Sequence, residues 1–139
     1  MSYEAFNTGS SVVVAWDRPA IEDVNAVVAL VQSAHVPARG DLAYVAYIPD
    51  GMKAPEGPVR AAMVRSISRI LERCAHMHFV IEGSGFGPSV GRSVMAGIIL
   101  AAGHRGRIHI YSSVDEAAAY LPGDAVTRLR SLQVRDAAS

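Results

Sequence analysis

The run LAYVAYI at residues 42–48 constrains the fold most, because almost every position in it is apolar. A strand with one face in water alternates apolar and polar residues, whereas a strand in a sheet covered on both faces does not. The run therefore predicts a buried strand whose sheet carries other elements on both faces.

The neighbouring segments complete an α/β pattern. Residues 3–16 read as two extended runs around a turn at Asn7 to Ser10, where Gly9 can take the positive φ of a tight hairpin. The remaining predicted elements are strands at 76–83 and 107–111 and helices at 20–35, 57–74, within 84–103 and at 113–121.

The order β-β-α-β-α-β-α-β-α, with right-handed crossovers, predicts a single α/β domain over residues 1–139. Its sheet is mixed, mostly parallel and five-stranded, with an N-terminal antiparallel hairpin and about four helices. The core spans about 3–121, and the tail 122–139 adds one or two helical turns around Val126, Leu129 and Leu132. The last helix begins at an S-x-x-E capping box, Ser113 to Glu116.

Helical spacing assigns buried faces to the first two helices. The arginines of the second helix are interpreted as its solvated face. The expected buried residues are Val24, Val27, Val28, Val31 and His35 in the first helix and Val59, Met63, Ile67, Ile70, Leu71 and Cys74 in the second.

Charge and cysteine content limit the partners. Thirteen basic residues balance thirteen acidic ones in 139 residues, so we expect neither nucleic acid nor an anionic membrane as a partner. The single cysteine, Cys74, has no partner for an internal disulfide, and the longest apolar stretch, 94–102, is shorter than the roughly 20 residues of a membrane span. We expect a cytoplasmic protein.

The segments SSVVVAW, LAYVAYI, HFVIEG and RIHIYSSVDEAAAYL, each strand leading into a helix, resemble the STAS superfamily, most closely its SpoIIAA-like branch. The resemblance covers roughly residues 3–121. It implies an interaction or regulatory module, whose phosphorylated relatives carry a serine in the loop after the third strand. A phosphate there would meet the free N–H groups of a helix N-terminus.

The corresponding loop here contains Asp50, Gly51 and Met52 and has no serine or threonine before Ser66. The phosphorylatable hydroxyl is therefore missing. Asp50 either acts as a fixed negative charge or forms an ordinary Pro-Asp-Gly turn with its neighbours.

Two further groups of residues have ligand-type chemistry. The turn EGSGFGPSVGRS could hold an anion through Ser84, Gly85, Ser89 and Arg92, or could simply be a permissive glycine-rich turn. Residues His76 and His78 point to one strand face, with His109 on a neighbouring strand, but Cys74 reads as a small core residue. We expect no metal and no cofactor; titration of these histidines could weaken an interface near pH 6.

The third helix is apolar around most of its circumference, so it is either central or part of an interface. We expect the interface, formed by Val94, Ile98 and Leu100, and hence a homo-oligomer. No serine or cysteine stands in a nucleophile motif, and no catalytic residue is expected. The sequence thus predicts a non-catalytic, SpoIIAA-like interaction module. The alternatives are a protein that binds a small apolar, lipid-like ligand, or an enzyme of unknown type.

Overall fold

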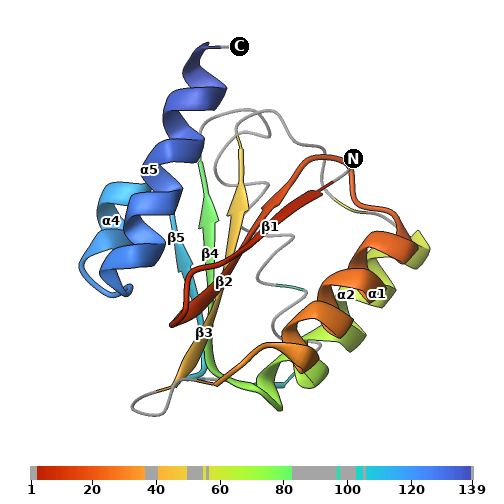
Figure 1. Ribbon diagram of the computed structural model, residues 1–139. Coiled ribbons are helices and arrows are strands. Elements are labelled where there is room, and N and C mark those ends of the chain that lie inside the picture. The colour runs from red at the N-terminus through yellow and green to blue at the C-terminus, as the bar shows by residue number, and fades with distance from the viewer. Residues whose placement is uncertain are drawn as a thin grey trace.

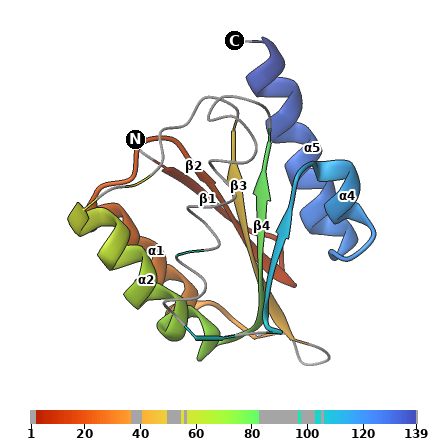
Figure 2. The same ribbon diagram turned by 180° about the vertical axis from the view of Figure 1, so that it is seen from behind.

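The computed structural model describes residues 3–36, 41–49, 55, 57–82, 97, 103, 104 and 106–138. These residues form one sheet with helices on both faces (Figure 1). Two helices lie on each face, and the view from behind shows the same layers (Figure 2). The elements are β1 (Tyr3–Asn7), β2 (Ser11–Trp16), α1 (Ile21–Ser33), β3 (Leu42–Ile48), α2 (Gly57–Leu71), β4 (Cys74–Ile81), β5 (Ile108–Tyr111), α4 (Val114–Ala118) and α5 (Gly123–Ala138).

The strands lie in the sheet in their order along the chain, β1-β2-β3-β4-β5. β1 runs antiparallel to β2, and every other neighbouring pair is parallel. The predicted fold class is therefore confirmed: an α/β domain with a mixed five-stranded sheet and, in the described part of the chain, four helices. The third predicted helix lies almost wholly outside the described residues.

The hairpin between β1 and β2 has the predicted glycine turn. Gly9 has a φ of 99°, which a residue with a Cβ rarely adopts. Its N–H donates to the Asn7 side-chain oxygen at 2.9 Å, an Asx-type contact that holds the turn. The register is then fixed, with Tyr3 opposite Trp16.

One core lies between the sheet and the helices α1 and α2. Val24, Val27, Val28 and Val31 are buried there as predicted. His35 is not, because α1 ends at Ser33 and the chain then turns away, which leaves His35 exposed. The strand residues of this core include Val12, Val14, Trp16, Tyr44, Ala46, Ile48, Met77, Phe79 and Ile81.

Cys74 is buried, but it does not extend the second helix as expected. α2 ends at Leu71, and after a two-residue turn Cys74 opens β4, which is longer at its start than the predicted strand. Burial raises the pKa of its thiol to about 12, although Arg73 and Arg107 oppose that shift. The cysteine therefore behaves as a small core residue.

A second core lies on the opposite face, under α4 and α5. The prediction for the tail was wrong in extent: residues 123–138 form one 16-residue helix rather than one or two turns. The helix is long because it has a face to bury on the sheet. Its fully buried residues are Ala125, Leu129 and Leu132, whereas Val126 is half-buried.

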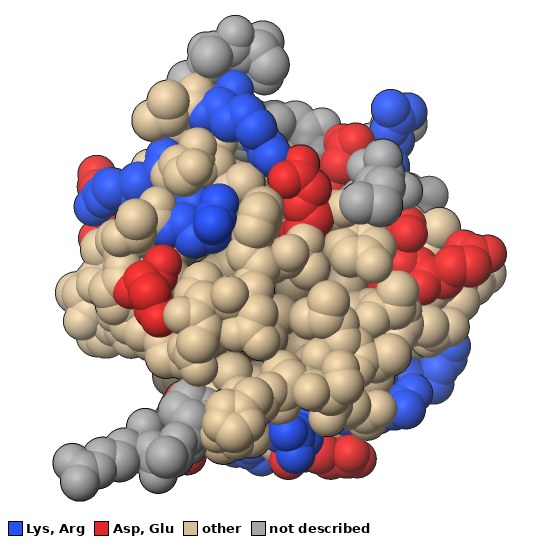
Figure 3. All heavy atoms as spheres, in the orientation of Figure 1, with Lys and Arg blue, Asp and Glu red and all other residues tan. Residues whose placement is uncertain are grey.

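Arginines of α5 also hold this helix against β1. The Arg128 guanidinium lies 4.2 Å from the centroid of the Phe6 ring, and Arg135 forms an ion pair with Glu4 at 2.6 Å. Viewed from the β1 side, the basic side chains gather over α5, and much of the middle of this face carries uncharged residues (Figure 3).

Candidate functional site

Three histidines share the sheet face that α4 and α5 cover only in part. His76 and His78 alternate along β4, so their side chains point to the same face, as predicted. His109 lies directly opposite His78 on the parallel neighbour β5. Because α4 and α5 pack over other parts of this face, the end with His76 is open to solvent.

Five aromatic rings form a continuous row on this face, here called the ring row: His76, His109, His78, Tyr111 and Tyr120. Successive ring centroids lie 5.1, 5.1, 5.9 and 5.8 Å apart. These separations are typical of stacked or tilted aromatic pairs. The row runs from His76 on β4, which is exposed, to Tyr120, which follows α4 in the chain. The Tyr120 residue is 70% exposed.

Hydrogen bonds fix two steps of the ring row. His109 Nε2 lies 3.1 Å from His76 Nδ1, and His78 Nδ1 lies 3.0 Å from the Tyr111 hydroxyl. A neutral imidazole has one N–H donor and one acceptor nitrogen. Some of the nitrogen and hydroxyl groups of the ring row therefore form hydrogen bonds with other members of the row.

Burial keeps the inner histidines neutral at pH 7. Burial first, and then the neighbouring His109 and His76, together lower the pKa of His78 from 6.5 to about 4. The pKa of His109 is also lowered, first by burial and then by His76. For Tyr111 the direction is opposite, because burial and then Tyr120 and Glu116 raise the pKa of the phenol.

A broad open hollow of about 660 Å³ lies against the ring row. Its volume is in the range of ligand and docking sites. Perturbed histidine pKa values beside such a hollow mark a candidate site. Besides the five rings, the lining residues are Ile108, Ile110 and Glu116.

The chemistry of the hollow is that of a stacking and hydrogen-bonding surface. Within the described ranges, no group of three or more His, Cys, Asp or Glu side chains is arranged to hold a metal ion. Cys74 lies in the core on the other face of the sheet, away from these histidines. The ring row thus offers aromatic faces, imidazole nitrogens and phenol oxygens to whatever docks there.

A serine and a histidine meet elsewhere, and sequence reasoning missed this pair. Ser68 Oγ lies 2.8 Å from His104 Nε2. No carboxylate of the described residues is hydrogen-bonded to His104, so the third member of a nucleophile triad is not present there. Ser68 is exposed, and the contact is a surface hydrogen bond.

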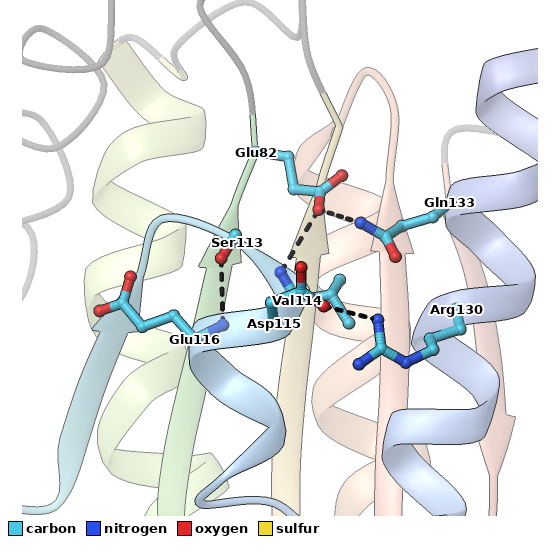
Figure 4. Close-up of polar contacts among 7 residues, drawn as sticks. All are labelled: Glu82, Ser113, Val114, Asp115, Glu116, Arg130 and Gln133. Carbon is cyan, nitrogen blue, oxygen red and sulfur yellow. Dashed lines mark hydrogen bonds and ion pairs between the residues drawn. The ribbon is translucent and has the colours of Figure 1, made fainter.

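The carboxyl ends of the parallel strands are the usual ligand edge of an α/β sheet, and Glu82 lies there. Its carboxylate accepts a hydrogen bond from Tyr47 Oη at 2.9 Å. It also accepts from Gln133 Nε2 at 2.5 Å and from Val114 N at 3.4 Å (Figure 4). One carboxylate therefore joins β3, β4, α4 and α5. Because its oxygens are occupied by protein donors, we assign it a structural role.

The predicted helix start at Ser113 is confirmed: Ser113 is the N-cap of α4, beside Glu82. Ser113 Oγ accepts from Glu116 N at 3.0 Å (Figure 4). The Glu116 carboxylate accepts from Ser112 N at 3.0 Å and from the Ser112 hydroxyl. Arg130 on α5 forms an exposed ion pair with Asp115 on α4 at 2.8 Å.

Most predicted site residues lie outside the described part of the chain. These include the loop that corresponds to the family switch, the possible anion-binding turn and the possible interface. The residues not described are Asp50, Gly51 and Met52; Ser84, Gly85, Ser89 and Arg92; and Val94, Ile98 and Leu100.

A second hollow, of about 200 Å³, lies at the neighbouring carboxyl ends of β2 and β3, next to Pro49 and the Glu4–Arg135 pair.

The cavity enclosed between the sheet, α1 and α2 has a volume of only about 20 Å³. An acyl chain needs far more, so this part of the core does not hold a lipid-like ligand. The segment of the third predicted helix lies almost wholly outside the described residues, so the alternative of a lipid-like ligand there stays a prediction.

No protein-family model, curated protein or solved structure matches the chain. Resemblance to the STAS superfamily remains a prediction from the sequence. Among the helices that the structure describes, none has the length and apolar character needed to cross a membrane.

Proposed function

We propose that this chain is a non-catalytic interaction module of SpoIIAA-like type that self-associates through the ring row and its hollow. The observation that carries the proposal is that one patch contains both a largely exposed aromatic ring, Tyr120, and a hollow that this ring helps to line. Tyr120 is 70% exposed, and the hollow of about 660 Å³ lies beside it. The proposed occupant of the hollow is Tyr120 of a second copy.

A two-fold dimer needs a patch that is complementary to itself. In such a dimer the Tyr120 ring of each copy enters the hollow of the other, so the same contact forms twice. Each aromatic pair contributes about 0.5–1.5 kcal/mol beyond the area it buries. Tyrosine is also among the residues that most often dominate the binding energy of an interface.

The charge state of the ring row favours association near pH 7. The lowered pKa values of His78 and His109 keep both imidazoles uncharged, so their burial against a second copy does not desolvate a cation. The row also carries hydrogen-bond donors and acceptors together. Two copies can therefore pair their polar atoms across the two-fold axis.

The sequence supports a module that is not switched by phosphorylation in the loop that follows β3. Residues 48–58 contain neither serine nor threonine. A reducing compartment such as the cytoplasm suits the buried free thiol of Cys74. In this proposal association depends on concentration and pH rather than on a phosphate.

Sedimentation velocity over a range of concentrations tests the proposal. Near pH 7 the wild type should show a monomer–dimer equilibrium, and Tyr120→Ala should raise the dissociation constant by at least about tenfold. Val134→Ala is the matched control, because Val134 is 72% exposed and does not line the hollow. A wild type that stays monomeric, or a Tyr120→Ala variant that dimerises as tightly, would contradict the proposal.

A further inference from the structure

Strand β5 lies at the edge of the sheet, and its outer side has no partner strand among the described residues (Figure 2). The strand contains no Asp, Glu, Lys, Arg or Pro. Charged residues and prolines are two of the features by which proteins keep an edge strand from pairing. The opposite edge strand, β1, carries Glu4, which forms an ion pair with Arg135 of α5. β5 therefore lacks a protection that β1 has.

The hydrogen bonds to β4 show which backbone groups of β5 point outward. Met77 N donates to the Arg107 carbonyl oxygen at 2.8 Å, and Met77 is the register partner of Ile108. In a parallel ladder, a residue bonds to the two residues that flank its partner, so Arg107 and His109 direct their backbone groups to β4. Because this direction alternates along a strand, the N–H and C=O groups of Ile108 and Ile110 point away from β4.

The hollow of about 660 Å³ reaches over this outer side, because every residue of β5 lines it. Successive side chains of a strand point to opposite faces, so a hollow on one face alone would meet only every second residue. The hollow therefore extends around the edge of the strand. Ile108 and Ile110 are half-buried and pack against the core under α1 and α2. An occupant of this edge meets their outward backbone groups and uncharged side chains.

A second copy of β5 fits this edge in a register that the ends of the strand determine. Gly106 has a φ of 83°, outside the range of a β-strand, so pairing stops at that end. At the other end, Ser112 N already donates to the Glu116 carboxylate at 3.0 Å. Only β5 itself is left. In a two-fold, antiparallel ladder its outward groups all pair only if Ile108 of one copy lies opposite Ile110 of the other.

We propose that two copies of this chain pair their β5 strands antiparallel around a two-fold axis at His109, which joins the two five-stranded sheets into one continuous sheet. Ile108 and Ile110 of each copy exchange N–H···O=C bonds with Ile110 and Ile108 of the other. This inference rests on the proposed self-association and names the contact that brings the two hollows together.

This register also continues the ring row from one copy to the other. His109 lies opposite His109 of the second copy in a non-hydrogen-bonded pair, where facing side chains are closest. Burial and then His76 lower the pKa of His109, so the facing imidazoles are uncharged near pH 7. Antiparallel pairing puts the Tyr111 end of one β5 beside the Arg107 end of the other. Tyr120, which stacks on Tyr111, is thereby directed to the end of the other row that contains His76.

Hydrogen exchange tests the pairing on the wild type. The protein is labelled in D₂O at two concentrations, above and below the dissociation constant of the dimer, and individual amides are read by NMR. The amides of Ile108 and Ile110 should exchange at least about tenfold more slowly in the dimer. The His109 amide bonds to β4 in both states, so its rate should change far less. A dimer in which Ile108 and Ile110 exchange as fast as in the monomer overturns the proposal.

Ile110→Pro tests the same contact by mutation. It removes an outward N–H without removing a hydrogen bond to β4, and proline is tolerated at such edge positions. In sedimentation velocity it should raise the dissociation constant by at least about tenfold, whereas the control Ile110→Val, which keeps the N–H, should dimerise like the wild type. If Ile110→Pro does not fold, the exchange rates of the wild type decide the question.

The two experiments separate this inference from the proposed self-association. A dimer that Tyr120→Ala weakens and Ile110→Pro does not would overturn the strand pairing and leave the self-association through Tyr120 in place. A wild type that stays monomeric would overturn both.

Discussion

His78 Nδ1 lies 3.0 Å from the Tyr111 hydroxyl, and each of these residues is 7% exposed. The pair lies in the middle of the ring row, on adjacent parallel strands. Protonation of His78 would place a charge in this buried stack, next to two other imidazoles. The stability of this sheet face should therefore depend on the pH of the solution through the protonation of His78.

Acid should destabilise the fold through His78. Its pKa is about 4 when folded and 6.5 when unfolded, so between these values the unfolded chain binds more protons. The stabilisation is complete above about pH 6.5 and is lost as the pH falls towards 4, by on the order of 2 kcal/mol. Urea unfolding at several pH values measures it. His78→Asn should flatten this dependence, and His35→Asn, at an exposed histidine, should leave it unchanged.

Glu82 should stabilise the junction between the sheet and the helices α4 and α5. Glu82→Ala removes the acceptor for Gln133 and for the first N–H of α4. We expect the free energy of unfolding to fall by about 2 kcal/mol, with a smaller loss for Glu82→Gln. Glu72→Ala, at an exposed position after α2, should change it by less than about 0.5 kcal/mol. Equal effects at the two positions would refute the structural role of Glu82.

The C-terminal helix should be part of the cooperative fold. Leu129 has no exposed surface, so Leu129→Ala leaves a cavity between α5 and the sheet. The expected loss in the free energy of unfolding is about 3 kcal/mol. Val134→Ala on the same helix should cost less than about 0.5 kcal/mol. A neutral Leu129→Ala would mean that α5 does not pack as described.

Cys74 should be chemically silent in the native protein. Burial raises the pKa of its thiol to about 12, so the reactive thiolate is scarce at pH 8. A thiol reagent such as DTNB should label it only as fast as the chain unfolds, and rapidly in urea. Fast stoichiometric labelling of the native protein would show that the thiol is accessible after all.

The sequence alone was sufficient for the sheet and part of the site. The unbroken apolar run at β3 predicted a sheet covered on both faces, and alternation along β4 placed His76 and His78 together. The same alternation along β5 places Tyr111 on the same face as His109. Tyr120 could not be placed, because its position depends on how the chain leaves α4 and packs on Tyr111.

The predictions that failed concern the ends of helices. Helical spacing continues through His35 and Cys74 in the sequence, but the helices stop earlier because the chain must turn into the next strand. For α5 the error was in the other direction. Ala125, Leu129 and Leu132 have the spacing of a buried face, yet only the open sheet surface beneath them makes a helix of that length stable.

Intermolecular NOEs in a mixed sample test the central claim most directly. Equal amounts of ¹³C-labelled and unlabelled protein are combined near pH 7, and filtered spectra record only contacts between different copies. The self-association account requires NOEs from the Tyr120 ring of one copy to the His76 and His109 rings of the other. A dimer whose intermolecular NOEs all lie elsewhere, or a protein that shows none at high concentration, would contradict it.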